Sequence, residues 1–297
     1  MSWLNGKGIA PKLFKEGKGV EKNEPEKKGF FKFFDIVWAK LGKFIQTNLL
    51  YTGLSLLWLI FLYVVIPVSY TWALSLTNGN EGQASNLVFG LRMLFTLIVF
   101  NLIGNPLIAP SYAFVTRCFT RGEPVWIWSD GWDVFKQNFK QSLALFLIDI
   151  VVILMSINGV VFYYMQYAST GEYVWLLLLS IFCAVLFVYI TMHYYIYQIM
   201  IAFECSFMQL IKNAMLCTIA NLPMTVILTI ISAGIIIGLA FAVFPGIVIV
   251  FDLTVGLCLT RYPMEFYASR VIGKKIKQQE KQISRNKARI TYTGEGK

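Results

Sequence analysis

Charged residues are scarce in this chain of 297 residues: they make up 14% of it, whereas hydrophobic residues make up 57%. A soluble domain has about 25% charged and about 45–50% apolar residues. The scarcity of charge therefore argues against an ordinary water-soluble domain and indicates a membrane protein. The apolar residues gather in six stretches, which are 49–76, 87–116, 142–167, 173–203, 222–244 and 247–262. Five of them reach the ~20 residues that a membrane-spanning helix needs, and the sixth is shorter and contains Asp252.

Lysine and arginine are missing from every second connection between these stretches. The connections 77–85, 168–172 and 245–246 contain neither residue. The other connections and the two ends of the chain, residues 1–47, 114–141, 203–221 and 261–297, hold all of the 26 except Arg92. Short cytoplasmic loops collect Lys and Arg because these residues are translocated poorly. The pattern predicts an all-α polytopic membrane protein with six transmembrane helices and with both termini in the cytosol.

Residue types that serve catalysis or bind metals are also few. The chain has one histidine and five cysteines without a Cys-x-x-Cys spacing, whereas a zinc site needs several closely spaced ligands. It contains no Gly-x-x-x-x-Gly-Lys-Ser/Thr phosphate-binding loop, and no Ser/His/Asp set, Cys/His pair or pair of catalytic carboxylates is recognisable. These absences predict a non-enzymatic protein that has no metal and no cofactor.

The two ends of the chain are basic and polar. We expect residues 1–28 to be a disordered cytosolic tail, residues 29–272 to form the membrane domain, and residues 273–297 to be a second basic cytosolic tail, because neither tail can bury enough apolar surface to fold alone. Beside a bilayer, such tails are attracted to anionic lipid head groups. This reading is favoured over nucleic-acid binding.

Three segments that precede pairs of apolar stretches carry apolar residues at steps of four, three and four. These residues are Phe34, Trp38, Leu41 and Ile45; Trp128, Trp132, Phe135 and Phe139; and Phe203, Phe207, Leu210 and Ala214. The spacing draws one stripe along a helix. It predicts three interfacial amphipathic helices. The second stripe has two competing roles: Phe135 and Phe139 are expected to lie on lipid, and Trp128 and Trp132 are candidates for docking a partner subunit.

Arg92, Asp149, His193 and Asp252 fall inside the apolar stretches, where each is costly unless it is paired. Their depths predict two pairs, Arg92 with Asp252 and Asp149 with His193. Two functions are open for these pairs: a polar pathway or ligand site in the bundle, or the fixing of helix packing. Pro106 and Pro110 remove two backbone donors from the second stretch, and they predict a kink near Pro106.

The order of several short motifs resembles the YesL-like family of bacterial membrane proteins, a family of unknown function. The matching pieces are Phe33-Phe-Asp-Ile-Val-Trp38, Asn48-Leu-Leu, Pro110-Ser-Tyr-Ala-Phe, Arg117, Arg121-Gly-Glu123, Phe135-Lys-Gln-Asn-Phe139 and Phe244-Pro-Gly246. Members of that family commonly sit beside sugar-importer components in bacterial genomes. The resemblance implies an accessory or scaffold subunit, with the permease subunits of a binding-protein-dependent (ABC-type) carbohydrate importer as possible partners. The alternative is a transporter or channel in its own right, which would use the kinked second stretch and Arg92 and Asp252.

Overall fold

The computed structural model describes residues 29–66, 68–242 and 250–294, and within these ranges the chain is helical with no strand. The predicted tail 1–28 and the connection 245–246 lie outside the described residues. The all-α prediction is confirmed. The elements are α1 (Gly29–Ala39), α2 (Leu41–Leu54), α3 (Leu56–Val65), α4 (Tyr70–Leu76), α5 (Glu81–Leu102), α6 (Ala109–Arg121), α7 (Ile127–Thr170), α8 (Tyr173–Met200), α9 (Phe207–Ala220), α10 (Leu222–Ala242), the π-helix η1 (Asp252–Gly256), α12 (Leu257–Thr260) and α13 (Tyr262–Gly294).

Several of these helices are long and apolar enough to cross a membrane. In the described ranges α5, α7 and α8 qualify by themselves, and the bent pairs α2–α3 and α9–α10 bring the total to five if each pair is one span. The pairs bend by 60° at Ser55 and by 87° at Asn221. The expected sixth stretch, 247–262, begins outside the described residues and continues as the π-helix η1, the short helix α12 and the start of α13. A membrane protein with three to five spanning helices is therefore supported, and the count of six stays a prediction.

The three predicted amphipathic stripes fall in different kinds of element. The first is divided between α1 and α2, the second occupies the start of the long helix α7, and most of the third lies in α9. α9 begins with a capping box, in which Ser206 and Gln209 satisfy each other's backbone N–H groups. α7 has 44 residues, which corresponds to about 66 Å at 1.5 Å per residue. Since the hydrocarbon core is only ~30 Å thick, α7 is about twice as long as a membrane-spanning helix needs to be.

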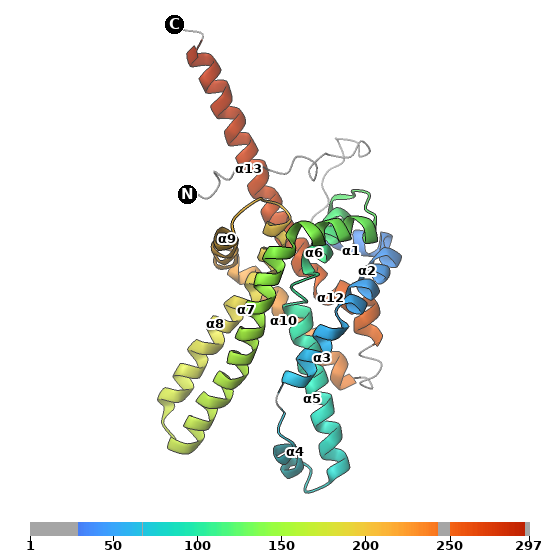
Figure 1. Cartoon of the computed structure of the whole chain (residues 1–297), viewed down its shortest axis with the longest axis vertical. Coiled ribbons are helices and arrows are strands. Elements are labelled where there is room, and N and C mark those ends of the chain that lie inside the picture. The colour runs from blue at the N-terminus through green and yellow to red at the C-terminus, as the bar shows by residue number, and fades with distance from the viewer. Residues whose placement is uncertain (1–28, 67, 243–249, 295–297) are drawn as a thin grey trace.

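The second half of α8 is the centre of the fold. Every residue from Thr191 to Met200 is buried, so this segment is covered on all sides. α7, α9, α13 and α6 all pack against α8. Towards one end of the molecule, the α7–α8 hairpin and the α4–α5 pair diverge, and α13 projects from the opposite end (Figure 1). Most of the predicted basic tail, residues 273–294, continues α13 as helix.

The orientation in the membrane can be tested by cysteine labelling. Single cysteines at Asn80, Thr170 and Glu123, in a background without the native cysteines, are expected to react differently with an impermeant thiol reagent on intact cells. Asn80 and Thr170 should be labelled and Glu123 should not, because the connections that contain the first two carry no Lys or Arg. Labelling at position 123 with protection at position 80 would show the opposite orientation. Labelling at only one of positions 80 and 170 would show that the number of spans between them differs from the prediction.

Candidate functional site

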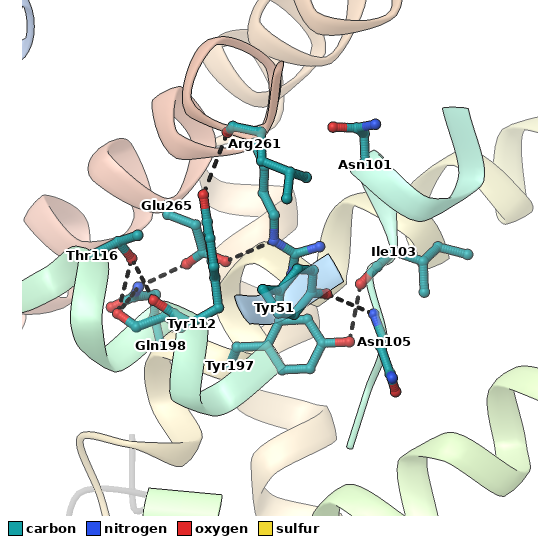
Figure 2. A network of polar contacts seen from close by, with 12 residues as sticks. Tyr51, Asn101, Ile103, Asn105, Tyr112, Thr116, Tyr197, Gln198, Arg261 and Glu265 are labelled. Atoms are coloured by element: carbon teal, nitrogen blue, oxygen red, sulfur yellow. Dashed lines mark hydrogen bonds and ion pairs between the residues drawn. The ribbon is translucent and has the colours of Figure 1, made fainter. Parts of the chain in front are cut away.

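A fully buried arginine lies at the centre of the bundle. Arg261, between α12 and α13, has no exposed surface. Its guanidinium carbon lies 5.7 Å from the ring centroid of Tyr51, 5.6 Å from that of Tyr112 and 5.5 Å from that of Tyr197. Figure 2 shows the three rings around the guanidinium group. A cation over an aromatic face within about 6 Å is attracted by the ring quadrupole, and more strongly when both are desolvated. We call Arg261 and the three tyrosines the arginine cage.

The counter-charge of the cage comes from Glu265 in the first turn of α13. The carboxylate of Glu265 lies 3.5 Å from Nε of Arg261, and both side chains are fully buried. The other oxygen of Glu265 accepts a hydrogen bond of 2.7 Å from Nε2 of Gln198 on α8. The backbone carbonyl of Gln198 accepts a hydrogen bond of 3.4 Å from Arg117 on α6. This chain of contacts ties α6, α8 and α13 together through charge-assisted interactions.

The cage is closed by the break between α5 and α6. The predicted kink near Pro106 is a full interruption, because α5 ends at Leu102 and α6 begins at Ala109. The freed backbone groups are satisfied by aromatic side chains: Tyr197 donates to the carbonyl of Ile103 (3.0 Å), Trp58 donates to the carbonyl of Gly104 (2.8 Å), and the N–H of Asn105 donates to the phenol oxygen of Tyr51 (2.7 Å). An irregular backbone at membrane depth requires such partners. Two of the three tyrosines of the cage therefore also hold the broken segment.

Gly104 allows this segment to approach the arginine. Its φ is +83°, a conformation that residues with a side chain rarely adopt. A Cβ atom at this position would lie 2.1 Å from Nη1 of Arg261 and 2.7 Å from the phenol oxygen of Tyr51. The arginine cage therefore requires a residue without a side chain at position 104.

The predicted pairing of Asp149 with His193 is confirmed. Nε2 of His193 lies 3.0 and 3.2 Å from the two carboxylate oxygens of Asp149, and both residues are fully buried. Nδ1 of His193 lies 3.0 Å from the backbone carbonyl oxygen of Tyr189, one turn earlier on α8. The phenol of Tyr189 donates to Asp149 as well. The pair links α7 to α8 one turn before the arginine cage, since Tyr197 follows His193 by four residues.

The predicted pairing of Arg92 with Asp252 is wrong. In the described residues the carboxylate of Asp252 accepts from Asn101 on α5, at 3.1 Å for both oxygens, while the guanidinium of Arg92 lies 5.9 Å from the ring centroid of Tyr63. Thr260 also donates to the carboxamide oxygen of Asn101. Asn101 follows Arg92 by nine residues, which is about half a turn around a helix of 3.6 residues per turn and about 14 Å along it. The face that presents Asn101 to Asp252 therefore directs Arg92 elsewhere.

The aromatic residues of the second stripe form a continuous ladder on α7. The ring centroids are 6.3 Å apart between Trp128 and Trp132, 5.0 Å between Trp132 and Phe135, and 5.3 Å between Phe135 and Phe139. Trp128 is 60% exposed and Trp132 is 46% exposed. One side of the ladder lines an apolar groove, and the rest is open to a partner or to lipid.

The arginine cage was missed by reasoning from the sequence. Arg261 stands at the inner end of the sixth apolar stretch, and it was grouped with the basic cytosolic residues that follow it. The available signal was the spacing of Arg261 and Glu265 by four residues, which places opposite charges on one helix face. The tyrosines could not be assigned to it, because they come from three separate helices.

Comparisons with family models, curated proteins and solved structures give no match for this chain. Membership in the YesL-like family therefore stays a prediction.

Proposed function

We propose that this chain is a non-enzymatic accessory or scaffold subunit of a complex in the bacterial plasma membrane. The observation that carries the proposal is the contrast between its interior and its surface. The buried charges Arg261, Glu265, Asp149 and Asp252 are held by residues of the same bundle. The exposed surface of the diverging hairpins and of the α7 ladder is rich in large apolar and aromatic side chains. Such a molecule has a fixed core and broad surfaces for neighbouring helices.

The partner that we propose is the permease part of a binding-protein-dependent carbohydrate importer. The support for this choice is the resemblance to the YesL-like family, together with the exposed ladder at the start of α7. Tryptophan is enriched among the residues that dominate protein interfaces. These features favour a protein partner for Trp128 and Trp132.

Changing Trp128 and Trp132 together to serine is expected to release the partner subunits in a gentle-detergent pull-down. Loss of an interface tryptophan typically costs about 2 kcal/mol or more, which is roughly thirtyfold in affinity. Trp72→Ser is the matched control, because Trp72 is 50% exposed but lies on α4, far along the chain from the ladder. Retention of the subunits at wild-type levels by the double variant would contradict the docking role.

The alternative function is a transporter or channel in its own right. The observation that favours it is the interruption between α5 and α6 beside buried charge, since broken helices at mid-membrane are typical of transporters. In this reading Arg92 and Asp252 act separately, because they do not contact each other. Flux measurements on the purified protein in liposomes separate the two functions: an accessory subunit moves no solute alone, whereas sugar or ion flux without other subunits would favour the transporter.

A further inference from the structure

An apolar groove lies between α2, α6 and the first turns of α7. It has a volume of about 160 Å³, and its walls include Leu50, Leu54, Val115, Trp128, Trp132 and Phe135. An engineered apolar cavity of about 150 Å³ holds benzene. The groove therefore has room for a segment of about six carbon atoms.

The polar groups at the groove are already engaged. The hydroxyl of Thr47 donates to the carbonyl of Lys43 (2.7 Å), and the hydroxyl of Ser111 donates to the carbonyl of Gly131 (2.7 Å). Tyr51 and Tyr112 form part of the wall, but their phenol groups contact Asn105, Asn48 and Leu257 inside the bundle. A polar ligand would lose its hydration without gaining partners. The groove therefore suits an unbranched apolar chain.

Two exposed lysines come from the helices that line the groove. Lys43 is one turn before Thr47 on α2, and Lys136 follows Phe135 on α7, with its ammonium 5.6 Å from the ring centroid of Trp132. Lys40, in contrast, donates to the carbonyl of Phe119, and its partial burial lowers its pKa. The carboxylate of Asp130 accepts a hydrogen bond of 2.9 Å from the backbone N–H of Trp126. Asp133 lies 3.8 Å from Lys136, and both are largely exposed, which makes the pair weak. The ammonium groups of Lys43 and Lys136 are thus exposed and only weakly engaged, and they can attract an anion.

We propose that this groove binds one acyl chain of an anionic phospholipid from the adjacent leaflet, with the head group at Lys43 and Lys136. The apolar walls select the chain, and the two ammonium groups select the charge of the head group. The bound chain would rest against Tyr51 and Tyr112, whose rings also contact Arg261. The lipid would therefore support the arginine cage from outside, and its binding does not depend on the proposed function.

The first test blocks the groove from within. A Cβ added at Gly131 would meet only Cβ of Ser111, at 3.8 Å, which is an ordinary contact. Gly131→Leu is therefore expected to fold and to place its side chain in the groove. Gly90→Leu on α5, where an added Cβ meets nothing within 4 Å, is the matched control. Each variant is purified in mild detergent with phosphatidylglycerol or phosphatidylethanolamine, and native mass spectrometry counts the retained lipid.

We expect the wild type and Gly90→Leu to retain one phosphatidylglycerol, and Gly131→Leu to retain less by more than about tenfold, because each buried methylene contributes roughly fourfold in affinity. The double variant Lys43→Gln and Lys136→Gln should bind both lipids equally. Equal retention by Gly131→Leu and the wild type would overturn the site. Loss of co-purified subunits from Gly131→Leu with unchanged lipid would also overturn it, because the groove would then hold a protein partner.

The second test uses the wild-type protein and needs no blocked variant. Delipidated protein in detergent receives one equivalent of phosphatidylglycerol with brominated acyl chains, which quench tryptophan at short range. Quenching is expected in the wild type and should be largely lost in the double variant Trp128→Phe and Trp132→Phe, since these two indoles line the groove. Quenching that stays unchanged in this variant would place the lipid elsewhere.

Discussion

Replacing Arg261 by leucine is expected to destabilise the protein by about 3–5 kcal/mol, the largest effect of any single side-chain removal in the bundle. The change leaves the carboxylate of Glu265 fully buried without its cation, and it removes the charge that three tyrosine rings surround. The measurement is thermal or denaturant unfolding in detergent, followed by loss of the monodisperse species.

The double variant Arg261→Leu and Glu265→Leu provides the control for this effect. Removing both charges leaves no isolated ion in the core, and replacing a buried pair by apolar residues is often neutral. We expect the double variant to be more stable than Arg261→Leu alone. Additive losses would mean that Arg261 and Glu265 do not stabilise each other and that the tyrosines alone hold the arginine.

Changing Gly104 to alanine is expected to cost a similar amount. The added methyl group would overlap Nη1 of Arg261 and the phenol oxygen of Tyr51. It would also impose a φ of +83° on a residue with a side chain, which by itself costs about 1–2 kcal/mol. The guanidinium or the broken segment must therefore move, and the hydrogen bonds of Gly104 and Asn105 are disturbed with it.

Gly122→Ala separates backbone strain from steric overlap. Gly122 ends α6 with a φ of +74°, and an added Cβ there meets nothing within 4 Å. This variant should lose only the cost of the backbone conformation. In an Arg261→Leu background, Gly104→Ala should cost less than it does in the wild type, because the overlapping guanidinium is gone. Equal costs in both backgrounds would show that Gly104 does not act through Arg261.

The features that follow from local sequence were predicted well. The apolar stretches gave helices, and Pro106 with its neighbours gave an interruption, because backbone donors and helix length are properties of short segments. The pair Asp149 and His193 was found from matched depth in neighbouring stretches. Matched depth predicted this pair correctly because α7 and α8 form a hairpin, in which residues at equal depth lie close together.

The arginine cage depends on information that depth and spacing do not contain. Matched depth does not say which face of a helix points inward, and this is why Asp252 meets Asn101 rather than Arg92. Charge counting assigned Arg261 to the cytosolic side, although packing of α13 against α6 and α8 buries it. The bends at Ser55 and Asn221 divide stretches that hydropathy presents as continuous.

The arginine cage also bears on how the protein is made. Tyr51, Tyr112 and Tyr197 are synthesised before Arg261, because translation proceeds from the N-terminus. Until α13 arrives, α2, α6 and α8 surround an electron-rich space with no cation, and Gln198 lacks the carboxylate of Glu265. The contacts that hold the arginine cage and the carboxylate of Glu265 can therefore form only after the last of their residues, at the start of α13, has been synthesised.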